Sequence, residues 1–248
     1  MWICPSDDLL RQPDALHIWR AALDVGPEQR ARLWHALEAD ERRRAERLRF
    51  EVLRQRFIAA HGMLRDVLSR YMAVPPESVR FAVRPGGKPE LASGESASWR
   101  FNLSHSGAMA LVAVAWRREV GVDIEQLRPM KGPLDIAARF FAPGEVAALR
   151  AMPPEQIDAA FFRCWTRKEA YVKALGKGLS LGLEKFEVTL DPHEPAALRH
   201  VVDMPDEPRR WWMEHLEPGP DYLGACVCQG RPARLHLWDW RLDLGETG

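Results

Sequence analysis

The chain has neither a surplus of one charge nor a long apolar run. Among its 248 residues, 35 are Lys or Arg and 35 are Asp or Glu, so the formal net charge at pH 7 is zero. Net charge therefore gives no reason to expect nucleic-acid binding. No stretch approaches 18 uninterrupted apolar residues, which predicts no membrane span. The first eight residues lack the basic and apolar regions of a signal peptide, so we expect a cytoplasmic protein.

Cysteine is scarce, and its spacing does not suggest a metal site. The four cysteines are Cys4, Cys164, Cys226 and Cys228, and no second Cys or His pair lies at zinc-binding spacing. Cys226 and Cys228 flank one residue of an apolar run, which places both on one face of a strand. We expect reduced thiols, buried or half-buried, in a reducing compartment. The Gly-x4-Gly-Lys-Ser/Thr spacing of a P-loop is also absent.

The hydrophobic pattern predicts an α+β protein. Helical periodicity runs from Arg30 to Tyr71 in at least two pieces and stops at Pro75-Pro76. Strongly apolar strands are expected at 109–116 and 120–125. Further helices are expected near 134–140, 143–151 and 157–175, and strands at 186–190, 211–216, 223–228 and 235–239. Helices precede strands in each half, which favours mainly antiparallel sheets. We place a boundary near residue 118, between halves 1–117 and 118–248.

Two segments carry the most chemical information. In Gly121–Glu125, the apolar Val122 and Ile124 alternate with Asp123 and Glu125. This strand periodicity directs both carboxylates to one face and both aliphatic side chains into the core.

The second segment is Trp165–Lys173, in which Glu169 and Lys173 are four residues apart. On a helix they share a face, with the acid nearer the N-terminus. Asp123, Glu125 and Glu169 together offer the hard oxygen ligands that Mg²⁺ prefers beside a phosphate. Each segment alone also fits a solvated strand face or an ordinary surface ion pair.

Five motifs follow one another along the chain: Gly86–Pro89, Phe101–Ser106, Gly121–Glu125, Trp165–Lys173 and Gly176–Leu179. With this order and spacing, the chain resembles the Sfp-type 4'-phosphopantetheinyl transferases of the holo-carrier-protein synthase superfamily, over roughly residues 30 to 190. The resemblance implies two similar α+β halves related by a pseudo-twofold axis, with the active site in the cleft between them.

The resemblance also implies a reaction. The family moves the phosphopantetheine arm of coenzyme A to a serine of an acyl or peptidyl carrier protein and releases adenosine 3',5'-bisphosphate. Asp123, Glu125 and Glu169 match the magnesium ligands, and Lys173 matches a lysine at the pyrophosphate. Glu169 is the candidate general base, acting directly or through a metal-bound water, and the sequence leaves both routes open.

Coenzyme contacts are implied at further positions. Ser104 and His105 match a pair that contacts the 3'-phosphate, and Lys88 matches a lysine at the nucleotide phosphates. Lys177 could assist with phosphate or only favour a helix C-terminus.

The arginine-rich segment 41–56 contains Arg44 and Arg56, which we align with basic residues that contact coenzyme phosphates. Leu53 stands where many relatives have an acid, so the register could differ by one turn. A solvated helix with Glu–Arg pairs is the alternative for most of these arginines.

The partner would be an acidic, helical carrier protein. Phe140, Phe141 and the helix at 143–149 are candidate contacts, whereas Phe161, Phe162 and Trp165 are expected in the core. Two halves in one chain would complete a site, so we expect a monomer that binds neither nucleic acid nor membrane. Two other functions stay open: another magnesium-dependent phosphotransferase, and an RNA-binding protein led by the arginine-rich helix.

Overall fold

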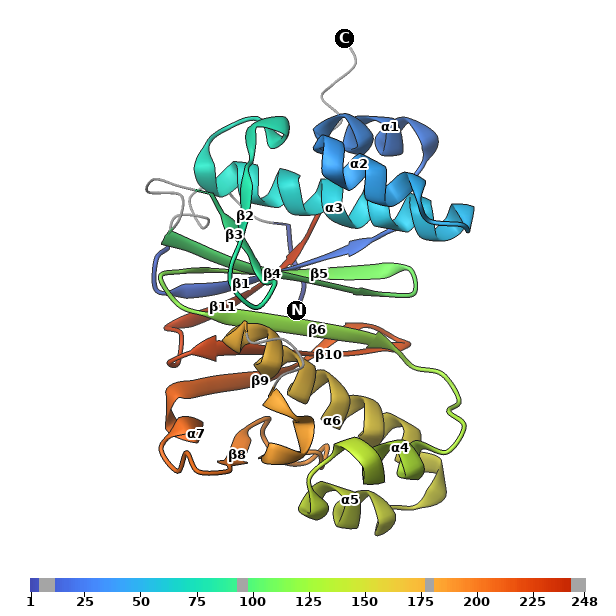
Figure 1. Ribbon diagram of the computed structural model, residues 1–248, viewed down its shortest axis with the longest axis vertical. Coiled ribbons are helices and arrows are strands. Elements are labelled where there is room, and N and C mark those ends of the chain that lie inside the picture. Colours follow the sequence, from blue (N-terminus) through green and yellow to red (C-terminus); the bar gives the residue numbers. More distant parts are fainter. Residues whose placement is uncertain (5–11, 93–97, 177–180, 242–248) are drawn as a thin grey trace.

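The structure is a computed structural model that describes residues 1–4, 12–92, 98–176 and 181–241. Two units lie one above the other (Figure 1). The first contains β1 (Ala15–Ala22), α1 (Pro27–Ala36), α2 (Ala39–Glu46), α3 (Glu51–Met72), η2 (Pro76–Ser78), β2 (Phe81–Val83), β3 (Pro89–Leu91), β4 (Trp99–Ser106) and β5 (Met109–Trp116). The second contains β6 (Val120–Gln126), α4 (Pro133–Phe140), α5 (Pro143–Arg150), α6 (Pro154–Leu175), η5 (Leu183–Lys185), β7 (Phe186–Val188), β8 (Leu198–Val201), α7 (Glu207–Arg210), β9 (Trp211–Gly219) and β10 (Tyr222–Gln229).

The two units repeat one topology. Each begins with a strand, continues through two short helices and one 22-residue helix, and ends with a short strand pair and a hairpin. In the first sheet β1 pairs with β5, which pairs with β4; in the second, β6 pairs with β10, which pairs with β9, and all four pairings are antiparallel. This repeat confirms the predicted α+β fold with two similar halves and mainly antiparallel sheets.

The last strand departs from the predicted division of the chain. Strand β11 (Arg234–Asp239) belongs to the sequence range assigned to the second half, yet it pairs in parallel with β1 in the first sheet. The apolar pattern predicts a strand here but carries no information about which sheet edge it covers.

Four layers result, with helices above and below two facing sheets (Figure 1). Leu16 and Ile18 of β1 point between the sheets and contact the core that also contains Val122, Cys226 and Cys228. The alternate residue Trp19 points the other way, into the core beneath α3. All four cysteines are free; Cys4 is exposed and the other three are buried. Among the described residues, no helix is long and apolar enough to cross a membrane.

The aromatic residues near α6 behave largely as predicted. Phe161 and Phe162 are 3% and 2% exposed, which confirms their place in the core, and Trp165 is half-buried. Phe141, predicted to contact a partner, is instead buried, because its ring stacks on Phe161 at a centroid distance of 5.1 Å. Its neighbour Phe140 remains 40% exposed.

Candidate active site

Strands β4 and β6 form a seam between the two sheets. Each is an edge strand of its own sheet, and they lie side by side without pairing as a ladder. Hydroxyl groups of β4 connect them: Ser104 Oγ donates to Asp123 Oδ1 (2.8 Å), and Ser106 Oγ donates to Glu125 Oε2 (2.8 Å). Alternate residues of β4 therefore orient the two acids of β6, both of which lie on the face predicted from the alternation.

Helix α6 lies directly on that face because residue 121 is glycine. A Cβ at Gly121 would lie 2.0 Å from the carbonyl oxygen of Ala170 and 2.5 Å from the amide nitrogen of Ala174, which real atoms cannot do. The close approach brings Lys173 onto the seam. Its Nζ lies 2.5 Å from Asp123 Oδ1 and 2.9 Å from Ser104 Oγ.

Negative charge is concentrated where β6 meets α6. Asp123 is only 4% exposed, and its Oδ2 is buried without a hydrogen-bond partner. The pKa of Glu169 is raised, first by burial and then by the charge of Asp123, with Glu125 adding to the effect and Lys173 opposing it. Three neighbouring carboxylates, one of them with an unpaired buried oxygen, suit a hard divalent cation.

The carboxylates are not in a finished metal-binding arrangement. Over the described ranges, no three His, Cys, Asp or Glu side chains are grouped so as to hold a metal ion. The ammonium of Lys173 instead lies against Asp123 Oδ1. The donor set fits Mg²⁺ in its chemistry, and Lys173 would have to share Asp123 with the ion.

His105 lies on the other side of β4, toward α3, and is exposed. Its pKa is lowered, first by partial desolvation and then by electrostatic interaction with His61 and Lys173. His61, which the sequence analysis did not single out, stacks on Phe57 with ring centroids 4.0 Å apart. A lone histidine within a helical pattern gives no signal of its position, so only the fold shows that it neighbours His105.

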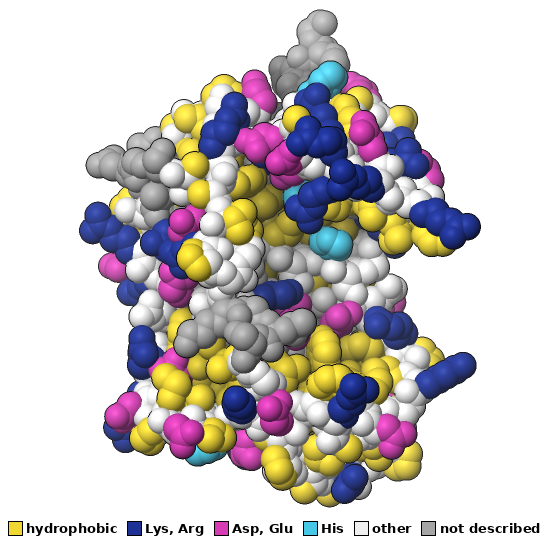
Figure 2. All heavy atoms as spheres, viewed as in Figure 1, with side chains coloured by type: hydrophobic (Ala, Val, Ile, Leu, Met, Phe, Trp, Pro, Cys, Tyr) yellow, Lys and Arg dark blue, Asp and Glu magenta, His cyan; other side chains and the backbone are white. Residues whose placement is uncertain are grey.

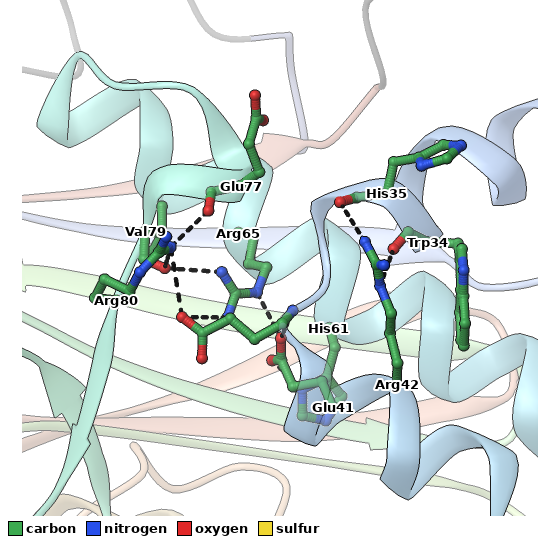
Figure 3. A network of polar contacts seen from close by, with 10 residues as sticks. Trp34, His35, Glu41, Arg42, His61, Arg65, Glu77, Val79 and Arg80 are labelled. Carbon is green, nitrogen blue, oxygen red and sulfur yellow. Dashed lines mark hydrogen bonds and ion pairs between the residues drawn. The ribbon is translucent and has the colours of Figure 1, made fainter.

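A buried network fixes His61 in place (Figure 3). Glu41 Oε1 lies 3.1 Å from His61 Nδ1, and Glu41 Oε2 accepts from Arg65 Nε at 2.6 Å. Arg65, which is fully buried, also donates to the carbonyl oxygen of Val79 (2.8 Å). The network joins α2, α3 and the chain beyond η2, and it holds the His61 ring in one orientation.

The two predicted arginines differ in their surroundings. Arg44 is exposed and lies over the ring of Phe57, 5.3 Å from its centroid. Arg56 is held by Asp24 through bonds of 2.7 and 2.9 Å, and this pairing raises its pKa. Figure 2 shows many Lys and Arg side chains over the upper helical layer, above the notch between the halves. Arg44 remains available to an anionic ligand, whereas Arg56 would first have to leave Asp24.

Lys88 does not lie as predicted. It is 8% exposed, and its ammonium donates to three acceptors of the protein itself, Glu119 Oε2, the Val120 oxygen and the Ala174 oxygen. Its three N–H groups are thereby used, which leaves none for a nucleotide phosphate. Lys177 lies outside the described residues.

A cavity of about 230 Å³ opens beside this seam. Its lining combines both halves: Gly86, Gly87, Lys88, Pro89, Asn102, Glu169, Val172, Lys173 and Gly176. A larger cavity of about 430 Å³, bordered by Glu145, Glu187 and Arg199, contains none of the predicted catalytic, metal-binding or coenzyme-binding residues. We therefore assign the candidate active site to the smaller cavity, which is lined by residues of four of the five motifs, Glu169 and Lys173 among them.

Comparison with known proteins defines the class. The profile described as "4'-phosphopantetheinyl transferase superfamily" matches residues 119–227, and "4'-phosphopantetheinyl transferase, N-terminal" matches residues 26–117. The chain is 43% identical to 4'-phosphopantetheinyl transferase HetI of Nostoc sp. over 240 residues, 96% of this chain and 98% of HetI. It is 36% identical to psf-1 of Bacillus pumilus, covering 78% and 79% of the two chains. It is 30% identical to Sfp of Bacillus subtilis, covering 84% and 88%.

The chain belongs to the 4'-phosphopantetheinyl transferase family. This membership confirms the predicted family and the predicted enzyme class.

Proposed function

We propose that this protein transfers the 4'-phosphopantetheine group of coenzyme A to a serine of an apo acyl or peptidyl carrier protein, releasing adenosine 3',5'-bisphosphate. Asp123, Glu125 and Glu169 would hold Mg²⁺. The observation that supports this most is the contact of Lys173 with the buried Asp123 carboxylate, since Lys173 and Glu169 also line a cavity formed by both halves.

The reaction requires three things of the site: a place for the pyrophosphate, stabilisation of the negative charge that grows on the leaving phosphate, and removal of the serine proton. When bound, the metal ion would supply Lewis-acid stabilisation of the pyrophosphate. Lys173, 29% exposed, can contact both Asp123 and an incoming phosphate oxygen. An ammonium at this position stabilises charge that is greatest in the transition state.

Glu169 is the proposed general base. Glu169 lines the cavity, and its carboxylate would take the serine proton either directly or through a bound water. Ser104 was predicted at the 3'-phosphate, but its hydroxyl is buried, donates to Asp123 and accepts from Lys173, so we propose instead that it holds these two side chains in register.

Coenzyme and carrier would approach from different elements. His105 is proposed to contact the 3'-phosphate. His61 acts electrostatically on it, and His61 stacks on Phe57, over which the exposed Arg44 lies. On α4, the exposed Phe140 ring lies 5.2 Å from the Arg139 guanidinium, an apolar and basic pair suited to an acidic helical protein. We further propose a cytoplasmic monomer, since one chain contributes both walls of the cavity.

The direct test is incubation with coenzyme A, Mg²⁺ and a panel of apo carrier proteins, read by intact mass. The expected result is a mass gain of one phosphopantetheine group on at least one carrier, and no gain on the same carrier with its acceptor serine replaced by alanine. Failure on every carrier, combined with phosphate transfer from ATP, would favour another phosphotransferase. Salt-sensitive binding to random RNA without transfer would favour the RNA-binding alternative.

Magnesium binding has its own readout. A ligand that binds only the folded state raises the melting temperature by mass action. Mg²⁺ should therefore raise the melting temperature of the wild-type protein and have no such effect on Asp123→Asn, which keeps side-chain size but loses the charge. Equal shifts in both proteins would remove Asp123 from the metal site.

A further inference from the structure

Lys88 connects the two halves at the end of α6. It comes from the loop between β2 and β3 in the first half, yet all three acceptors of its ammonium belong to the second half. The distances from Nζ are 2.9 Å to the Val120 oxygen, 3.0 Å to the Ala174 oxygen and 3.1 Å to Glu119 Oε2. One side chain thus binds the start of β6 and the last turn of α6 together.

The aliphatic part of Lys88 contributes as well. It lies over Gly176, which ends α6 in the left-handed conformation at φ 67°; a Cβ there would be 3.1 Å from Lys88 Cδ. The last carbonyl groups of a helix have no partner within it, and the Ala174 oxygen finds one in the Lys88 ammonium. The side chain therefore covers and caps the end of α6 from the opposite half.

Glu119 makes this arrangement possible. It accepts from Lys88 and, in addition, from Arg84 Nη1 at 2.8 Å and lies 3.2 Å from Arg100 Nε. Three cations of the first half thus meet one carboxylate of the second. A buried ammonium is costly unless it is paired. Burial lowers the pKa of Lys88, and the charge of Glu119 opposes that shift.

The contact of Lys88 with Ala174 lies one residue from Lys173, the proposed pyrophosphate contact. Ala174 follows Lys173, whose ammonium touches Asp123, and Gly121 allows the same turn of α6 to rest on β6. We propose that Lys88 is a positioning residue of the transfer reaction, which holds the last turn of α6 on β6 so that Lys173 stays over Asp123. This inference rests on the proposed function and replaces the predicted contact of Lys88 with a nucleotide phosphate.

The two roles predict opposite results for Glu119→Gln. If Lys88 positions α6, loss of the Glu119 charge weakens the contact of Lys88 with β6 and α6. kcat should then fall on the order of 10- to 100-fold, the scale for a slightly misplaced catalytic group. The KM for coenzyme A should stay unchanged. If Lys88 contacts a phosphate, removing its competitor Glu119 should instead lower the KM for coenzyme A and leave kcat intact.

Lys88→Met, which keeps the stem and removes the charge, should reproduce the loss in kcat, with equal KM ratios for coenzyme A and dephospho-coenzyme A. Added to Lys173→Ala, it should slow transfer little further, because it acts through Lys173. Lys185→Met is the matched control, since Lys185 is exposed and no side-chain bond of it is found in the described part of the chain. It should behave as wild type. A raised KM with unchanged kcat in Lys88→Met would overturn the proposal.

A second readout does not depend on activity. Amide hydrogen exchange at residues 174–176 should be faster in Glu119→Gln and Lys88→Met than in the wild type and the Lys185→Met control. If the wild-type protein transfers nothing, the proposed function is refuted, but hydrogen exchange still tests whether Lys88 holds the last turn of α6. Unchanged exchange in both variants would refute the positioning role of Lys88. If Lys88→Met does not fold, the exchange and kinetics of Glu119→Gln alone test that role.

Discussion

At the scale of single residues, the contact of Lys173 with Asp123 should contribute both to the stability of the fold and to the rate of transfer. Lys173→Ala should reduce kcat by at least about a hundredfold, because it removes a charge that matters most in the transition state. The melting temperature should fall slightly, since buried Asp123 would keep only Ser104 as a donor. Steady-state kinetics and a thermal melt measure both. Lys173→Arg should recover part of the rate if charge suffices, and little if a proton must be delivered; an unchanged kcat in Lys173→Ala would end the assignment.

Glu169 should make the protein less stable as the pH rises. Its pKa is raised in the folded state, so the folded protein binds the proton more tightly than the unfolded chain does. Stability is therefore lost as the pH rises from the ordinary glutamate pKa, about 4.3, through the raised value. Glu169→Gln should abolish transfer and unfold at a higher urea concentration at pH 7. Between the ordinary and the raised pKa of Glu169, the stability of this variant should fall less with pH than that of the wild type. Urea titrations at several pH values test this; a less stable variant at pH 7 would contradict it.

His105 should contribute more to coenzyme recognition in acid. Its lowered pKa leaves the imidazole largely neutral above its ordinary pKa of about 6.5. As the pH falls, protonation should strengthen a contact with the 3'-phosphate. The ratio of KM values for dephospho-coenzyme A and coenzyme A should rise toward acid in the wild type and stay flat in His105→Ala. A flat ratio in both proteins would give His105 a structural role only.

The sequence predicted these residues unevenly. Period-2 and period-3.6 spacing placed Asp123 with Glu125 and Glu169 with Lys173 on shared faces, and their roles were predicted from the family resemblance. Such spacing says nothing about what lies opposite, so His61 and Glu119 were missed. For the same reason Lys88 was predicted at the ligand, although its partners are 31, 32 and 86 positions away along the chain.

At the scale of elements, the packing of α6 on β6 depends on Gly121. Gly121→Ala should destabilise the fold by about 1–3 kcal/mol, because the added methyl would meet backbone atoms of α6 that cannot rotate away. It should also abolish transfer by moving Lys173 off Asp123. Gly26→Ala is the control: its φ is −64° and no atom lies within 4 Å of the position that the added methyl group would take. Chemical denaturation and a transfer assay compare the two variants. Equal stability and equal transfer rates would show that the close packing of α6 on β6 at Gly121 is not required.

Most helices and strands follow from periodicity, but the short ones do not. The predicted helix 157–175 is observed as Pro154–Leu175, and the predicted strand 109–116 is observed unchanged. Strands β3 and β8, with three and four residues, are stabilised by their partners β2 and β7 and show too little alternation to stand out.

At the scale of the whole molecule, β11 completes the first sheet from the far end of the chain. A protein truncated after Gly230 should lose the fully buried Trp238 and leave β1 with an open edge. We expect lower solubility and a lower melting temperature. Adding a synthetic peptide of residues 231–241 should restore part of the melting temperature, which a scrambled peptide should not do. A truncated protein as stable as the intact chain would show that β11 contributes little.

The same strand sets the order of events during synthesis. β1 is among the first residues to leave the ribosome, whereas its parallel partner follows roughly 200 residues later, on the order of ten seconds or more at 5–20 residues per second. Throughout that time the nascent first half carries an uncovered strand edge, and the long loop closure adds to the delay. The newly made chain is therefore exposed to mispairing with its neighbours on the same polysome, and chaperone demand during expression should fall when β11 is supplied early, as in a circular permutant that begins at residue 231.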